Sequence, residues 1–138
     1  MAVLLALYLL EINGDAKPER KKVLRFIKNR NLVTFKEGDL DPVGNGEEKW
    51  MNDLSWARED VKESGLVAMP EYGRWQLTAR GREKLLERAK KWAELYEKDR
   101  AEAETLISHC QRLNQNYLAH MVCLGRGINI AKISSVKL

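Results

Sequence analysis

The feature that most constrains this chain is a helix-like segment that ends at a glycine and is followed at once by two short apolar runs. Apolar residues recur at helical spacing over residues 47–64, and Gly65 supplies a C-terminal cap. The runs at 66–69 and 75–78 flank the turn sequence PEYG, and a new helix begins near Thr78, a residue suited to an N-cap. The pattern predicts a helix, a two-stranded ribbon and a further helix.

Two more helices are expected upstream. The opening run MAVLLALYLL is apolar on every side, which predicts a buried helix. It lacks the basic flank of a signal peptide and is shorter than the ~20 residues of a membrane-spanning helix, so no membrane partner is expected. A second apolar stripe lies among the basic residues after Pro18. Three helices followed by a two-stranded ribbon predict a mainly α protein, a winged helix-turn-helix with a long C-terminal helix. The ribbon is the wing of this fold.

Two stretches of this region resemble a known family. The residues W-A-R-x-x-V-K-x-x-G-L-V at 56–67 and G-R-W-Q-L-T-x-x-G-R at 73–82 are similar to the N-terminal domain of Mrr-type restriction proteins. The resemblance covers roughly residues 1–88. In that family a winged helix precedes a separate nuclease domain that acts on modified DNA. The resemblance implies a stand-alone DNA-recognition module or regulator of a restriction system, without the nuclease half.

The charge of the chain is distributed unevenly. The formal net charge is +4 and the pI is about 9.1, which permits a polyanionic partner. Residues 15–30 carry +5 and residues 71–91 carry +4, whereas residues 47–64 carry −3. We therefore expect duplex DNA to be held through its backbone by the second helix and the wing, with Lys49 and Asn52 as base readers. The predicted DNA-binding residues are Lys21, Lys22, Arg25, Lys28, Lys49, Asn52, Arg58, Arg74, Arg80 and Arg82.

Trp56 and the acidic third helix each leave an alternative open. Trp56 lies opposite the apolar face of its helix, so it either packs against another helix or the wing, or contacts a flipped or modified base. The acidic helix leaves a second function open for the whole protein. That alternative is a protein-interaction module that keeps the winged-helix fold without binding DNA.

An apolar seam is predicted in the C-terminal half. Apolar and aromatic residues recur at steps of three and four from Leu85 to His120. The spacing predicts a long helix over 83–120, between a winged-helix domain at 1–82 and a tail at 121–138. One winged-helix core cannot cover this seam, so we expect a homodimer; the alternative is an intramolecular hairpin formed with the C-terminal residues. The predicted dimerisation residues are Leu85, Trp92, Tyr96, Leu106, Cys110, Leu113 and Tyr117.

The sequence favours a protein that is not an enzyme. Asp41 followed by Glu47, Glu48 and Lys49 resembles the metal-binding acids and lysine of Mrr-type nucleases. Its short spacing places it at a loop-to-helix junction, whereas a metal site needs carboxylates fixed on rigid elements. We expect no catalytic residues and no cofactor.

A zinc site is also not expected. The candidate ligands are His109, Cys110, His120 and Cys123. On one helix, positions 109 and 120 lie ~16 Å apart along the axis, too far to converge on one ion. Two cysteines do not form a disulfide framework, which favours a reducing, cytoplasmic setting.

Overall fold

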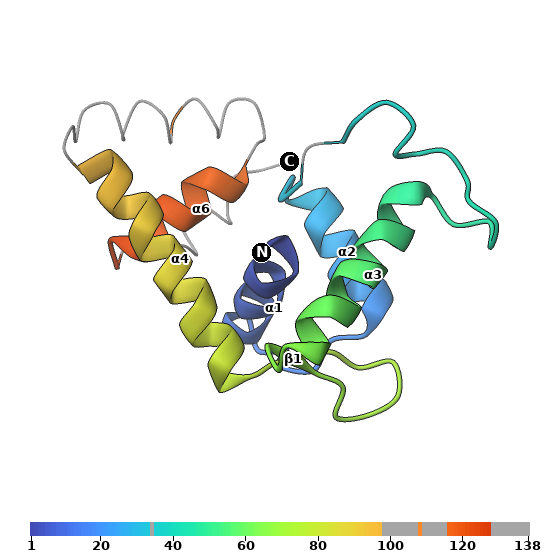
Figure 1. Cartoon of the computed structure of the whole chain (residues 1–138), viewed down its shortest axis with the longest axis horizontal. Helices are drawn as coiled ribbons and strands as arrows, with labels where there is room; N and C mark the ends of the chain where they lie inside the picture. Colours follow the sequence, from blue (N-terminus) through green and yellow to red (C-terminus); the bar gives the residue numbers. More distant parts are fainter. Residues whose placement is uncertain (34, 98–107, 109–115, 128–138) are drawn as a thin grey trace.

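The computed structural model describes residues 1–33, 35–97, 108 and 116–127, and these form helices and one small sheet (Figure 1). The elements in chain order are α1 (Ala2–Ile12), α2 (Arg20–Asn29), α3 (Lys49–Glu63), β1 (Val67–Ala68), β2 (Gln76–Leu77), α4 (Ala79–Glu97) and α6 (Asn116–Gly125). The two strands pair antiparallel between α3 and α4. The fold is therefore mainly helical with a two-stranded antiparallel sheet, an arrangement compatible with a winged helix.

Helix α1 forms the centre of the core. It lies between α4 on one side and the α2–α3 pair on the other (Figure 1). Residues 3–7 are all buried, which confirms the prediction that the apolar opening helix is surrounded by other elements. None of the helices in the described part of the chain is long and apolar enough to cross a membrane.

Caps that the sequence predicts join the ribbon to its flanking helices. Gly65 ends α3 with a φ of 77°, in the left-handed region that favours glycine. The Thr78 hydroxyl oxygen accepts a hydrogen bond from the Gly81 N–H at 2.9 Å, and the hydroxyl donates to the Gly65 carbonyl at 2.7 Å. Val67 pairs with Leu77, and both side chains are buried, so the ribbon adds to the core.

The tip of the ribbon is hydrogen-bonded to the start of α2. The Trp75 N–H donates to the Pro18 carbonyl at 2.9 Å, and the Arg20 N–H donates to the Gly73 carbonyl at 3.2 Å. Trp75 is 1% exposed and belongs to the largest buried side chains. The ribbon and the first turn of α2 therefore form one continuous surface.

The C-terminal helices differ from the prediction. Helix α4 ends at Glu97, and α6 packs against α4. A Cβ added to Gly125 would lie 2.1 Å from the Ala89 carbonyl oxygen and 2.8 Å from the Ala93 Cβ. In one straight helix, positions 89 and 125 would be ~54 Å apart. The single long helix predicted over 83–120 is therefore wrong: the chain folds back, because small residues let α6 bury its apolar side chains on α4.

This fold-back accounts for the part of the apolar seam that the structure describes. Leu85 is fully buried, and Trp92 and Tyr117 pack, partly buried, against the same core. These three predicted dimerisation residues therefore pack, fully or in part, within the chain itself. The predicted tail also begins inside α6. The side chain of Tyr96, together with Leu106, Cys110, Leu113 and residues 128–138, lies outside the described residues.

Candidate nucleic-acid interface

Two predicted DNA-binding residues are free on the outer face of α2. Lys21 and Arg25 are exposed and make no hydrogen bond or ion pair with the described residues. They lie four residues apart, so their side chains extend from the same face of the helix. Their neighbours are partnered: Lys22 Nζ lies 2.5 Å from an Asp15 carboxylate oxygen, and Lys28 Nζ lies 4.0 Å from Glu48. These last two pairs are largely exposed and therefore weak.

The predicted DNA-binding residues of the ribbon and of α4 differ in whether a carboxylate of the chain already pairs with them. Arg74 lies 3.2 Å from a Glu19 carboxylate oxygen and also donates to the Lys17 carbonyl at 3.2 Å. Arg82 pairs with Glu11 of α1. Arg80 is exposed and has no ion pair within the described part of the chain. Arg80 therefore adds a third free cation, at the start of α4.

The predicted residues of α3 contribute little free positive charge. Arg58 has a side chain only 14% exposed, with its guanidinium carbon 5.2 Å from the centroid of the Trp75 ring. Its Nη1 lies 2.9 Å from Glu59, but at an angle that forms no hydrogen bond. Lys49 donates to Asp53 at 2.8 Å, and this hydrogen bond raises the pKa of the lysine. The side-chain amide of Asn52 makes no hydrogen bond with the described residues.

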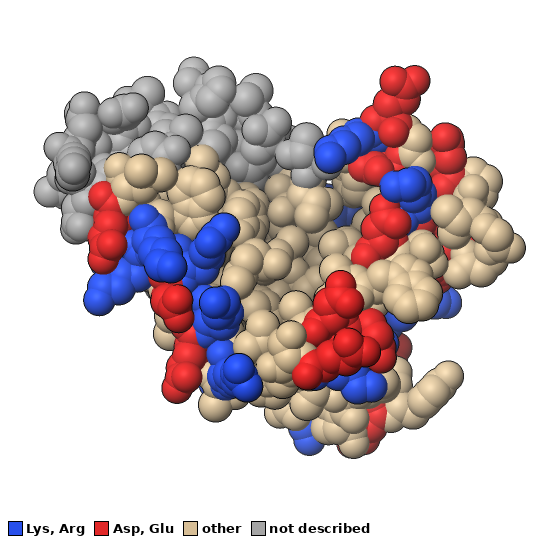
Figure 2. Space-filling model, in the orientation of Figure 1, with Lys and Arg blue, Asp and Glu red and all other residues tan. Residues whose placement is uncertain are grey.

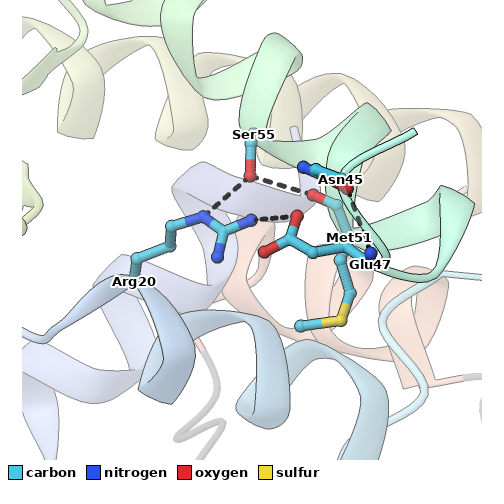
Figure 3. Close-up of polar contacts among 5 residues, drawn as sticks. All are labelled: Arg20, Asn45, Glu47, Met51 and Ser55. Carbon is cyan, nitrogen blue, oxygen red and sulfur yellow. Dashed lines mark hydrogen bonds and ion pairs between the residues drawn. The ribbon is translucent and has the colours of Figure 1, made fainter. Parts of the chain in front are cut away.

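Arg20, which is not among the predicted DNA-binding residues, is the centre of a polar network at this interface (Figure 3). Its Nε donates to the Ser55 hydroxyl at 3.0 Å, and its Nη2 donates to a Glu47 carboxylate oxygen at 2.7 Å. The Ser55 hydroxyl in turn donates to the Met51 carbonyl at 2.9 Å. These partners are 27 and 35 residues from Arg20 in sequence, so no local pattern distinguishes it from the other cations of its basic run.

The network forms one side of a pocket on the outer face of α3. The pocket has a volume of about 560 Å³. It is lined by Arg20, Asn45, Glu47, Asn52, Ser55, Trp56, Arg58 and Glu59. Trp56 is 67% exposed, so the interpretation in which it packs against another helix or the wing is wrong. None of the described helices or strands covers the ring.

A second hollow shares Arg20 with this pocket and extends to the tip of the ribbon. It has a volume of about 470 Å³. Its lining comprises Glu19, Arg20, Lys21, Tyr72, Gly73 and Arg74. Tyr72 is fully exposed there. Elsewhere on the surface, basic side chains gather along α4 and acidic ones near the C-terminal end of α3 (Figure 2).

The nuclease-like residues are engaged with other partners. The Glu47 carboxylate is bound by Arg20 and the Lys49 ammonium by Asp53, although the backbone of Asp41 is next to them, accepting from the Lys49 N–H at 2.8 Å. The described residues contain no group of three or more His, Cys, Asp or Glu side chains that could hold a metal ion.

Half of the zinc-type residues lie in α6. His120 and Cys123 are buried there, and burial raises the pKa of the Cys123 thiol, which keeps it protonated. The other two candidates, His109 and Cys110, lie outside the described residues.

The fold and this surface define a class: a small, mainly helical domain in which a two-stranded ribbon follows the third helix. A family model, the Mrr N-terminal domain, matches residues 4–87, more than half of the chain. The chain belongs to the Mrr N-terminal domain family, which is associated with restriction-system proteins. No curated protein and no solved structure matches it.

The Arg20–Glu47 pair should make stability depend on pH. The hydrogen bond from Arg20 lowers the pKa of the Glu47 carboxyl below 4.5. A lowered acid pKa stabilises the folded state above the unfolded-state value, and this stabilisation is lost as pH falls through the lowered pKa. Glu47→Gln should therefore reduce the free energy of unfolding at pH 7 by about 1 kcal/mol. The difference should shrink as pH falls below 4.5, as measured by urea unfolding.

Glu37→Gln is the matched control, because Glu37 is exposed and has no ion pair among the described residues. It should leave stability unchanged at both pH values. An equal loss in both variants, or a Glu47→Gln loss that persists at low pH, would contradict the assigned ion pair.

Proposed function

We propose that this protein binds duplex DNA without catalysing a reaction, as a recognition module or regulator in a reducing, cytoplasmic setting. The observation that carries the proposal is that three of the predicted contact residues, Lys21, Arg25 and Arg80, are exposed and make no ion pair with the described residues. A phosphate contact needs a positive side chain that no carboxylate of the protein already neutralises. The buried, free thiol of Cys123 supports the reducing setting.

Weaker pairs would add to the contact. The ion pairs of Lys22, Lys28 and Arg74 have lysine or arginine side chains 41% to 54% exposed, so they can exchange a carboxylate for a phosphate at little cost. These residues lie on α2 and at the ribbon tip, which the hydrogen bonds around Arg20 and Trp75 hold together. The proposed contact is therefore mainly to the DNA backbone, with Lys49 and Asn52 as the proposed base readers.

Absence of catalysis belongs to the same proposal. The Glu47 carboxylate, which would hold a nuclease metal, is bound by Arg20, and the described residues contain no group of three or more His, Cys, Asp or Glu side chains that could hold a metal ion. Magnesium and plasmid DNA should therefore leave the plasmid intact.

The proposal is tested by fluorescence anisotropy with a labelled duplex at several salt concentrations. Contact with about three to five phosphates predicts that log K falls with log salt with a slope of about −3 to −4.5. Affinity that does not change between about 50 and 200 mM salt, or the absence of binding at low salt, would refute it. The same samples, incubated with magnesium, report whether the duplex remains intact.

A protein partner is the second candidate, and the acidic side of α3 favours it. Asp53, Asp60 and Glu63 are exposed on that helix. If this face binds a basic protein, Asp60→Lys with Glu63→Lys would abolish that binding and leave DNA affinity unchanged or higher.

The homodimer stays a prediction. Less apolar surface of α4 is available for it, because part of the predicted seam is buried within the chain. Leu86 and Leu95 of α4 remain 40% and 64% exposed, whereas the seam position Leu85 is buried within the chain. Light scattering that reports the chain mass of 15.9 kDa at tens of micromolar protein would exclude it.

A further inference from the structure

The pocket beside Trp56 has the composition of a site for a flat, polar ligand. One wall is an indole ring that is 67% exposed, an unusual cost for a large aromatic side chain in an isolated domain. The rest of the lining is polar or charged and carries both hydrogen-bond donors and acceptors. An apolar ligand would leave these groups without partners, so the pocket suits a ligand with an aromatic face and a polar edge.

The polar side of the pocket is held in place before any ligand arrives. Arg20 uses two of its five N–H donors on Ser55 and Glu47, which leaves others for a ligand (Figure 3). The Asn45 side-chain oxygen accepts from the Glu47 N–H at 3.0 Å, so the amide nitrogen of Asn45 remains a donor. Asn52 has neither its donors nor its acceptor engaged by the described residues. Two amides and a guanidinium therefore line a pocket with an exposed indole.

These groups match an unstacked nucleobase. Proteins recognise such a base by stacking it on an aromatic ring and by hydrogen bonds to its polar edge. A phosphate fits less well, because the carboxylates of Glu47 and Glu59 also line the pocket. A base inside a duplex fits less well too, because its faces are covered by its neighbours.

We infer that this pocket accepts a single nucleobase that has left the helical stack, with Trp56 stacking on its face. The inference rests on the proposed function and deepens it. The sugar-phosphate backbone attached to this base would lie in the neighbouring hollow at the ribbon tip. Arg20 lines both hollows, and Lys21 and Arg74 line the second. A strand that crosses from one hollow to the other places its base beside Trp56 and its phosphate beside two cations.

The test compares the affinity of the full chain for three labelled duplexes. One is fully paired, one carries a single bulged adenine, and one carries a bulged abasic nucleotide at the same position. The bulged adenine is already unpaired, so the protein does not have to open a base pair to reach it. Stacking on Trp56 should make binding of the bulged adenine about tenfold tighter than binding of either other duplex.

Three variants assign this preference to the ring. Trp56→Ala should bring the affinities for the three duplexes to within about twofold of one another, while Trp56→Phe should keep most of the preference. Leu95→Ala removes another exposed apolar side chain, far along the chain on α4, and should change none of the affinities. Because Trp56 is exposed, Trp56→Ala should melt at the same temperature as the parent.

The outcomes separate the inference from the proposed function. Binding to none of the duplexes overturns both. Equal affinity for the paired and bulged duplexes overturns the inference and leaves duplex binding standing. An abasic bulge bound as tightly as the adenine bulge would mean that the protein recognises bent DNA, and a preference that survives Trp56→Ala would place the base elsewhere; either result overturns the inference.

Discussion

Replacing Gly81 with alanine is expected to remove about 3 kcal/mol of stability, although alanine in a helix normally stabilises relative to glycine by up to about 1 kcal/mol. Gly81 is buried in the first turn of α4. An added Cβ would lie 2.0 Å from the Leu66 carbonyl oxygen and 2.8 Å from the Leu77 Cδ1. The Leu66 oxygen accepts a hydrogen bond from the Thr78 N–H, so it cannot move without disturbing the end of the ribbon.

The matched control is Gly44→Ala. Gly44 has no left-handed φ and no atom within 4 Å of an added Cβ, so stability should change by less than about 0.5 kcal/mol. Urea unfolding of the two variants and the parent measures both effects. If Gly81→Ala is as stable as the parent or more so, the close approach of α4 to the ribbon is incorrect.

Reversing two charges on α2 should have the largest effect on DNA affinity. Lys21→Glu with Arg25→Glu converts two proposed phosphate contacts into repulsions, so binding should weaken more than about 100-fold at physiological salt. The slope of log K against log salt should become less steep by about 2. Both side chains are exposed and without ion pairs among the described residues, so the fold should be unaffected. Anisotropy measures affinity, and circular dichroism checks the fold.

The control must change the net charge by the same amount at another place. Lys90→Glu with Lys91→Glu does this on α4, where basic side chains also gather (Figure 2). It should weaken binding less than about tenfold, because only long-range attraction is reduced. If the two double variants lose affinity equally, or if the α4 variant loses more, DNA lies along α4 and the proposed surface is wrong.

The sequence predicts most of the fold up to α4, because interactions between residues close in sequence decide where these helices begin and end. Gly65 ends a helix because it tolerates a positive φ, and Thr78 begins one because its hydroxyl accepts a free backbone N–H. The apolar opening helix can only be buried. Each of these conclusions needs no knowledge of a distant residue.

The C-terminal half is harder to predict, since the spacing of apolar residues along a helix does not show which segment packs against them. Spacing from Leu85 onward fits a partner chain and a fold-back equally well. The deciding contact joins Gly125 to Ala89, two small residues on segments that spacing alone treats as one helix. The sequence therefore predicts the apolar seam, but it does not predict that α6 of the same chain packs on it.

The candidate site is the least predictable part. Charge counts locate basic segments, but they do not show which cations are already engaged with acids. Arg82 is engaged by Glu11, 71 residues away, whereas Arg25 is free of ion pairs among the described residues. A helical wheel likewise places Trp56 opposite the core face without showing that its side chain is 67% exposed in the fold. Partners that meet only in the folded chain decide each of these points.

The hydrogen bonds between the ribbon tip and the start of α2 affect the entropy cost of binding a ligand at this surface. The Gly73 and Pro18 carbonyls fix the tip against the helix, so the ribbon is not a loose arm that must be ordered on contact. Ordering a mobile loop on binding would cost conformational entropy and weaken the complex. Here that ordering is completed during folding. The surface meets its ligand with much of its backbone geometry already formed, so shape selects among ligands at first encounter.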